Sequence, residues 1–113
     1  MPYFGVRESI SGGFDAAVKK VKANGFDCIQ IFSANASRWD AKPILASESE
    51  KFQRALVETS ISRPLIHVAY LINIASANPE LLEKSINAFR EELERAAALG
   101  IPQVVMHLSL IHI

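Results

Sequence analysis

Short apolar segments alternate with amphipathic helical segments along the chain, and this order constrains the fold more than any other feature. The apolar segments of strand type lie at residues 3–6, 28–32, 65–70 and 103–107. Apolar residues at helical spacing follow each of the first three segments. Alternating strands and helices favour a parallel sheet with right-handed crossover connections. We therefore expect an α/β fold built from parallel β/α units.

The third helical segment has clear signals at both ends. Asn78 suits the N-cap, Pro79 suits the first helical position, and the sequence Leu-Gly-Ile-Pro at 99–102 suits the end. One apolar stripe predicts the buried face of this helix. Its residues are Leu82, Ile86, Phe89, Leu93 and Ala97.

The number of units leaves two architectures open. Four β/α units in 113 residues suit a nearly complete flavodoxin-like sheet, or the first half of an eight-stranded barrel of about 250 residues. A parallel strand that is buried on both faces needs a helix to cover it, yet only six residues follow His107. The residue pattern alone does not choose between these folds.

Composition narrows the function classes. Twelve basic and twelve acidic residues give a net charge of zero, so no global positive field favours nucleic acid or anionic lipid. Any DNA binding would therefore be local. The single cysteine, Cys28, cannot form an internal disulfide, which suits a reducing compartment. Apolar stretches are too short to span a bilayer and no leader is present, so we expect a cytoplasmic protein without membrane association or an obligate protein partner.

Two of the predicted strand segments contain a histidine. His67 lies in the third strand segment and His107 ends the fourth. If the strands are parallel, both imidazoles leave the sheet at its carboxyl end, where α/β folds place their ligands. Imidazole is a common zinc ligand, although either histidine alone could be a hydrogen-bonded residue at a strand end. Two imidazoles are also too few, because a zinc site commonly has about three or four protein ligands.

Several motifs together resemble the endonuclease IV family, the zinc-dependent apurinic/apyrimidinic endonucleases with a TIM-barrel fold. The matching segments, in order, are 5–9 with the Gly-Gly turn at 12–13, 35–43, His67 with Tyr-Leu-Ile-Asn at 70–73, the helix start at 78–85, and His107. The resemblance covers residues 3–107. It implies that residues 1–107 form the amino-terminal half of a (β/α)8 barrel.

The resemblance also implies a site and an activity. His67 and His107 would share one zinc of a multi-zinc cluster, with the other ligands on later strands. The reaction would be hydrolysis of the phosphodiester 5′ to an abasic site, in base-excision repair of DNA. The loops after the second and third strands would contact abasic DNA, and the residues implied there are Asn35, Arg38, Tyr70 and Leu71. Catalytic residues are not identified.

Three positions depart from the family pattern. Arg7 stands where the first strand of the family usually carries a histidine, and Ser37 stands where a loop arginine is usual. Val68 stands where an aspartate commonly follows the histidine of the third strand. These departures keep a second enzyme class open, the metal-dependent sugar isomerases and epimerases that resemble xylose isomerase. A third alternative is a non-catalytic flavodoxin-like module.

The last six residues, 108–113, read Leu-Ser-Leu-Ile-His-Ile, where the family has a Pro-Gly-Ser-like turn. The same hexapeptide is encoded by one reading frame of a common transposon-based sequencing adapter. We therefore expect residues 108–113 to be a non-native tail on a truncated gene product. We also expect this truncated chain to be inactive by itself.

Overall fold

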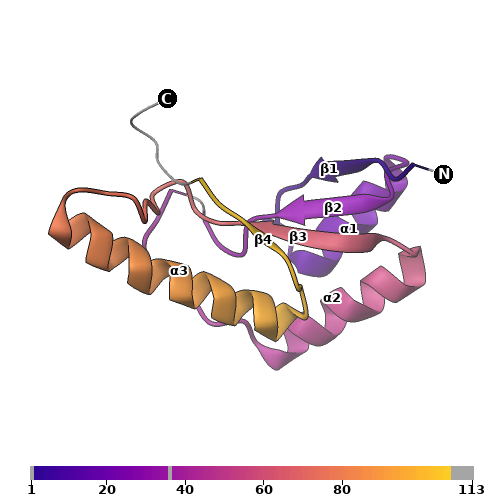
Figure 1. Cartoon of the computed structure of the whole chain (residues 1–113). Coiled ribbons are helices and arrows are strands. Elements are labelled where there is room, and N and C mark those ends of the chain that lie inside the picture. The colour runs from indigo at the N-terminus through magenta and orange to yellow at the C-terminus, as the bar shows by residue number, and fades with distance from the viewer. Residues whose placement is uncertain (1, 36, 108–113) are drawn as a thin grey trace.

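The computed structural model describes residues 2–35 and 37–107, and contains one parallel four-stranded sheet (Figure 1). The strands lie side by side in chain order, and they are β1 (Gly5–Arg7), β2 (Cys28–Ile31), β3 (Ser62–His67) and β4 (Val104–Val105). Every neighbouring pair is parallel. This sequential order is that of a TIM barrel opened along one seam. A flavodoxin-like sheet reverses its strand order at a switch point, so the flavodoxin-like alternative is wrong.

Three helices lie on one side of this sheet (Figure 1). They are α1 (Phe14–Ala23), α2 (Ala46–Thr59) and α3 (Pro79–Leu99). The predicted start of α3 is confirmed, because the Asn78 side chain accepts hydrogen bonds from the backbone N–H groups of Glu80 and Leu81 at 3.0 and 3.1 Å. Its predicted end is confirmed as well, with Gly100 in the left-handed conformation at φ 75°. No helix in residues 2–107 is both long and apolar enough to cross a membrane.

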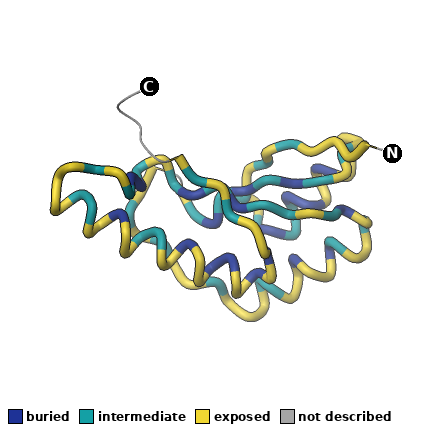
Figure 2. The backbone as a smooth tube through the Cα atoms, in the orientation of Figure 1, coloured by how far each residue is buried: buried dark blue, intermediate teal, exposed yellow. Residues whose placement is uncertain are grey.

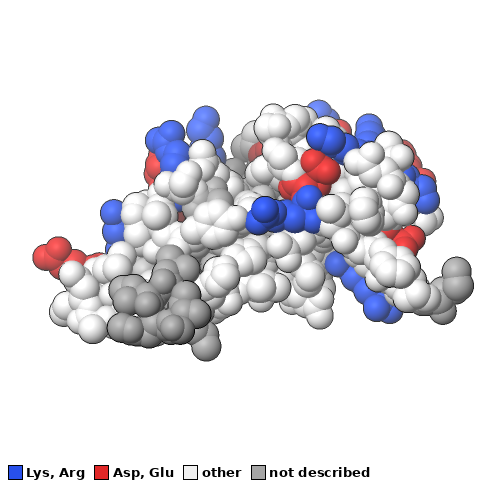
Figure 3. Space-filling model, turned by 90° about the horizontal axis from the view of Figure 1, so that it is seen from above, with Lys and Arg blue, Asp and Glu red and all other residues white. Residues whose placement is uncertain are grey.

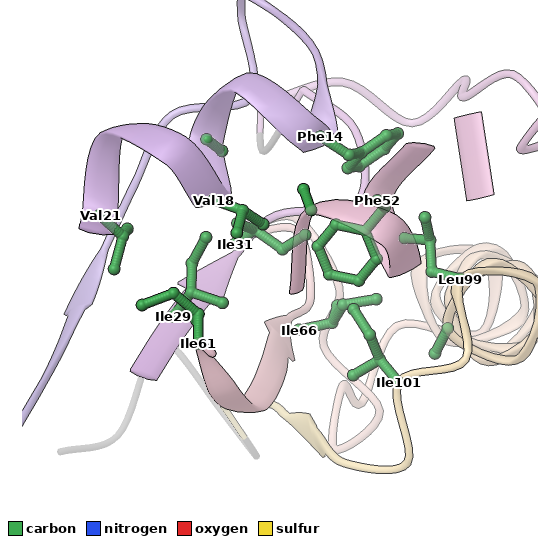
Figure 4. Close-up of a cluster of buried hydrophobic side chains, with 13 residues drawn as sticks. Phe14, Val18, Val21, Ile29, Ile31, Phe52, Ile61, Ile66, Leu99 and Ile101 are labelled. Atoms are coloured by element: carbon green, nitrogen blue, oxygen red, sulfur yellow. The ribbon is translucent and has the colours of Figure 1, made fainter. Parts of the chain in front are cut away.

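The core fills the space between the three helices and one face of the sheet (Figure 4). Ile29, Ile31 and Ile66 point into it from the middle strands, and Phe52 from α2 is fully buried among them. Buried residues recur on the strands and on the inward sides of the helices (Figure 2). Alternate strand residues, such as Gln30, lie on the opposite face and are only half-buried. Coverage of one face by helices is the arrangement of a barrel wall.

The third strand differs from its predicted range of 65–70. β3 begins earlier because Ser62 pairs with Cys28 of β2, and it ends at His67, which pairs with Val105. Beyond Val68 the chain turns, and the N–H of Ile72 donates to the Ala69 carbonyl at 3.2 Å. The strand ends here because β4, its partner, ends at the same level. His67 is therefore the last residue of β3, and residues 69–73 form a loop.

The predicted buried face of α3 is wrong. Ile86 and Leu93 are 44% and 48% exposed, although both belong to the predicted apolar stripe. The fully or nearly buried residues of α3 are Ser85, Glu92, Arg95, Ala96 and Leu99. Part of this helix faces polar loop atoms in place of the apolar sheet, and buried polar atoms need polar partners. The predicted tail at 108–113 lies outside the described residues.

Candidate functional site

His67 and His107 are neighbours at the carboxyl end of the sheet. His67 ends β3 and is half-buried, and His107 follows β4 and is exposed. Their ring centroids are 5.0 Å apart, and the two ring planes are inclined by 53°. The expectation that both imidazoles leave the sheet at the same end and lie together is confirmed.

A backbone contact selects the nitrogen of His67 that is available to a ligand. Nδ1 of His67 lies 2.7 Å from the carbonyl oxygen of Val68. A carbonyl oxygen only accepts hydrogen bonds, so this contact places a proton on Nδ1. In the neutral ring, Nε2 then carries the lone pair that a metal ion would bind. A backbone or carboxylate partner on the second nitrogen is the usual way in which proteins orient a ligand histidine.

The donor set in this part of the chain is small. Within residues 2–35 and 37–107, no three His, Cys, Asp or Glu side chains gather in a way that could hold a metal ion. The two imidazoles are chemically suited to zinc, but they are fewer than a stable zinc site uses. The two imidazoles therefore suit at most part of a ligand set.

Two further side chains hold Tyr70 beside the histidines. The ring centroid of Phe32 lies 5.4 Å from that of His67 and 5.2 Å from that of Tyr70. Arg7 donates from Nη1 to the Tyr70 hydroxyl at 2.9 Å, and its Cζ lies 5.6 Å from the Phe32 ring centroid. Phe32 is not among the site residues predicted from the sequence. The sequence signal for Phe32 was its position directly after β2, because this position corresponds to that of His67 at the end of β3.

A hollow opens beside Tyr70, between the end of β1 and the loop after β2. Its volume is about 520 Å³, which is within the usual range for small-molecule sites, roughly 300–1,000 Å³. Asn35 and Tyr70, two of the predicted DNA-binding residues, both line it. The complete lining is Arg7, Glu8, Ser9, Ile10, Ser11, Phe32, Ala34, Asn35 and Tyr70.

The other predicted DNA contacts lie outside this hollow. Arg38 is exposed and pairs with Asp40 through contacts of 3.2 and 3.3 Å. A backbone hydrogen bond, and then the Arg38 guanidinium, hold the pKa of the Asp40 carboxyl below its usual value. Leu71 is half-buried next to Tyr70, which is 42% exposed. The Asn35 side-chain oxygen accepts from the N–H and the hydroxyl of Ser37 at 3.0 and 2.8 Å, so Asn35 also shapes its own loop.

Charged side chains are dispersed over the face of the molecule that is seen from above. In the view from above (Figure 3), Lys and Arg side chains form several separate groups, and much of the surface between them is uncharged. This distribution agrees with the zero net charge.

A buried polar cluster was not foreseen from the sequence. It contains Ser33, which follows β2, and Glu92 and Arg95 from α3. On sequence grounds a glutamate and an arginine three positions apart in a helix suggest a solvated pair. The available signal was that Glu92 is one helical turn from Ala96, and two turns from Leu99, on the same side of the helix.

Comparison with known proteins decides the family. The sequence profile of the family described as "Xylose isomerase-like TIM barrel" matches residues 18–111. The chain belongs to the xylose isomerase-like TIM barrel family. Among curated members, "Probable endonuclease 4" of Chloroflexus aggregans is 46% identical over 107 residues, and that of Geobacter sp. is 40% identical over 107 residues. Each match covers 95% of this chain, with 37% and 38% of the respective relative.

Two solved structures agree with this assignment of the fold. Endonuclease IV from Thermus thermophilus superimposes with a TM-score of 0.87 at 32% identity, over 94% of this chain and 40% of that protein. A D-psicose 3-epimerase superimposes with a TM-score of 0.69 at 17% identity, over 95% of this chain and 37% of that one, which shows a shared fold. The resemblance to the endonuclease IV family is confirmed. The chain spans about two fifths of the length of these relatives.

Proposed function

We propose that these residues belong to a zinc-dependent apurinic/apyrimidinic endonuclease, which hydrolyses the phosphodiester 5′ to abasic sites in DNA. The observation that carries the proposal is the pairing of His67 and His107, 5.0 Å apart between ring centroids, at the carboxyl ends of β3 and β4. The relatives named endonuclease 4 and the similarity to endonuclease IV support it. The protein would act as a hydrolase in DNA repair.

His67, through Nε2, and His107 would hold one zinc ion, together with ligands from outside the described residues. Bound zinc supplies a Lewis acid that lowers the pKa of water and neutralises phosphate charge. The task of the chain itself is orientation. The Val68 carbonyl fixes the tautomer of His67, and the Phe32 ring packs against His67 on one side. Two imidazoles bind zinc weakly, so the 113-residue chain alone would be inactive.

DNA recognition would use the two loops beside the histidines. Tyr70 stands 42% exposed with its hydroxyl fixed by Arg7, so its ring can lie against a base or sugar at the lesion. Leu71 follows it and can act as an apolar wedge. Insertion is favoured at an abasic site because the missing base lowers the unstacking energy. Arg38 would contact a backbone phosphate, and Asn35 would line the hollow that receives the strand.

A metal-dependent sugar isomerase or epimerase is the second candidate. The observation in its favour is the hollow of about 520 Å³ beside Tyr70, whose size and partly polar lining, with Ser9 and Ser11, suit a small sugar. One observation does not favour this second candidate. Arg38 and Leu71 do not line the hollow, so a sugar bound in it would not contact them.

The test uses the protein expressed from the full-length gene that encodes these residues, here called the complete protein. Zinc content is measured first, and the protein is then incubated with a duplex that carries one abasic site and with a matched undamaged duplex. We expect bound zinc and a nick 5′ to the abasic site only. Zinc-loaded protein that leaves abasic DNA intact and epimerises a ketohexose would replace this proposal with the second candidate.

A further inference from the structure

The inner face of α3 is polar where the helix passes the loops that follow β2 and β3. Ser85, Glu92 and Arg95 are 0%, 2% and 7% exposed. Their spacing of seven and three positions places them on one side of the helix. Buried polar groups of this kind reduce stability unless they are hydrogen-bonded, and apolar residues of similar volume often serve equally well. The hydrogen-bond partners of these three residues therefore indicate their role.

Glu92 and Arg95 hold the beginning of the loop after β2. The Ser33 hydroxyl donates to Oε1 of Glu92 at 2.7 Å, and Nε of Arg95 donates to Oγ of Ser33 at 2.8 Å. Arg95 also pairs with Glu92 through Nη2. Ser33 is thus bonded to both charged groups, and it stands two residues before Asn35 in the same loop. The same loop contacts α3 again at Trp39, whose ring centroid lies 4.6 Å from the ammonium nitrogen of Lys84.

Ser85 holds the loop after β3. The backbone N–H of Asn73 donates to Oγ of Ser85 at 2.9 Å, and both residues are buried. The Asn73 side chain in turn accepts from the N–H of Ala75 at 3.0 Å, which shapes the next turn. Asn73 lies three residues after Tyr70. One helix face therefore bonds to both of the loops that carry the predicted DNA contacts.

The two loops meet over Glu92. A small cavity lies there, bordered by Asn35, Arg38 and Trp39 from one loop and by Ala69 and Ile72 from the other. Glu92 and Arg95 also border it. Oε2 of Glu92 is buried and has no hydrogen-bond partner within the described residues. Burial of a polar oxygen without a hydrogen-bond partner lowers the stability of the fold. The place of Glu92 at the junction of the two loops is therefore more consistent with a role in positioning the loops than with a role in stability.

We propose that Ser85, Glu92 and Arg95 are positioning residues, which set the loops after β2 and β3 relative to one another so that Arg38 and Tyr70 engage DNA together. The DNA part of this inference rests on the proposed function. The positioning of the two loops does not. Glu92 and Arg95 act on the first loop through Ser33, and Ser85 acts on the second loop through the N–H of Asn73.

The first experiment measures the loops without DNA. Hydrogen–deuterium exchange is followed in the complete protein and in its Ser33→Ala and Ser85→Ala variants, with Glu83→Gln on the exposed side of α3 as control. Each Ser→Ala change removes a single hydroxyl group, and Glu92 keeps Arg95 as partner in Ser33→Ala, so we expect both variants to fold. We expect exchange at least about threefold faster in residues 34–45 for Ser33→Ala only, and in residues 69–77 for Ser85→Ala only. Equal acceleration in both loops, or none, would overturn the proposal.

The second experiment measures coupling to DNA binding. In the complete protein, Arg38→Ala and Tyr70→Phe should each weaken binding to an abasic duplex by about fivefold. In the Ser33→Ala background we expect the effect of Arg38→Ala to fall below about twofold while that of Tyr70→Phe persists, and in Ser85→Ala the reverse. Effects that stay additive in both backgrounds would show a merely structural role. If no variant binds DNA at all, the proposed function fails, and the exchange experiment still decides the loop positioning.

Discussion

The Arg7 guanidinium donates a hydrogen bond from Nη1 to the Tyr70 hydroxyl across 2.9 Å, and so joins the end of β1 to the loop after β3. Arg7 also lies over the ring of Phe32, which is itself in contact with Tyr70. Arg7 from β1 and Phe32 from the position after β2 thus contribute to the orientation of one exposed aromatic ring. Arg7, a departure from the family pattern, has a structural role here.

This relationship predicts a coupled effect on DNA binding. In the complete protein, Arg7→Met and Tyr70→Phe should each weaken binding to abasic DNA by about three- to tenfold, because each removes the same hydrogen bond. The double variant should be no weaker than the poorer single variant, as expected for residues in direct contact. Binding is measured by fluorescence anisotropy, with Arg54→Met, an exposed residue of α2, as the matched control. Fully additive losses would contradict the coupling.

The pairing of Arg38 with Asp40 predicts that Asp40 opposes DNA binding. The carboxylate is charged at neutral pH, as an aspartate ordinarily is, and it competes with phosphate for the guanidinium. Asp40→Asn should therefore strengthen binding to abasic DNA by about two- to threefold, and the gain should diminish at high salt. Glu58→Gln removes an equal charge from the last turn of α2, which leads into the opposite end of the sheet, and should have no effect. Weaker binding by Asp40→Asn would contradict this role.

The lowered pKa of the Asp40 carboxyl links the stability of the fold to pH. A folded pKa below the unfolded one contributes stability that is present above the unfolded pKa and is lost as the pH falls through the folded pKa. Because both Asp40 and Arg38 are exposed, solvent screens this contribution. We therefore expect the unfolding midpoints of Asp40→Asn and the parent protein to coincide at neutral pH in thermal denaturation. A clearly lower midpoint would indicate a structural role that the exposed pair does not explain.

The buried pair Glu92–Arg95 predicts different stabilities for single and double variants. Glu92→Ala leaves the Arg95 charge buried without its partner and should destabilise the fold by about 3–5 kcal/mol. Replacement of both residues by Met should be nearly neutral, because it removes both charges and retains the packing volume. Urea unfolding, followed by circular dichroism, measures both values. A Glu92→Ala variant as stable as the double variant would exclude a strong buried ion pair.

Phe52 tests the core. Its side chain is fully buried between α1, α2 and the sheet, with an edge-on contact to Phe14 at 6.3 Å between centroids. Phe52→Ala should lower the free energy of unfolding by about 3–5 kcal/mol through lost burial and a cavity. Val57 lies on the same helix but is 78% exposed, and Val57→Ala should change stability by less than about 0.5 kcal/mol. Similar losses in both variants would contradict the assignment of the core face.

Local patterns predicted the architecture well, because the relevant signals are close in sequence. The caps of α3 at Asn78 and Gly100 depend on neighbouring residues, and both are confirmed. The pairing of His67 with His107 followed from one topological rule, the parallel order of adjacent strands. The repeated β/α unit therefore predicts most of the fold and the juxtaposition of His67 and His107.

Contacts between distant segments were not predictable in this way. Nothing near Glu92 indicates that its partner, Ser33, lies 59 positions away at the end of another strand. For this reason α3 was assigned the wrong buried face: its polar side meets loops, and its apolar residues Ile86 and Leu93 stay exposed in the described segment. The end of β3 was also misplaced, because the length of its partner β4 decides it.

In the proposed function, His67 and His107 bind one zinc ion together. The most direct measurement is the zinc content of the complete protein and of its His67→Ala and His107→Ala variants, by inductively coupled plasma mass spectrometry after dialysis. Asn35→Ala, a change in the neighbouring loop, serves as control. We expect each histidine variant to lose about one zinc per molecule, with full retention in Asn35→Ala. Parent-level zinc in both histidine variants would contradict the account.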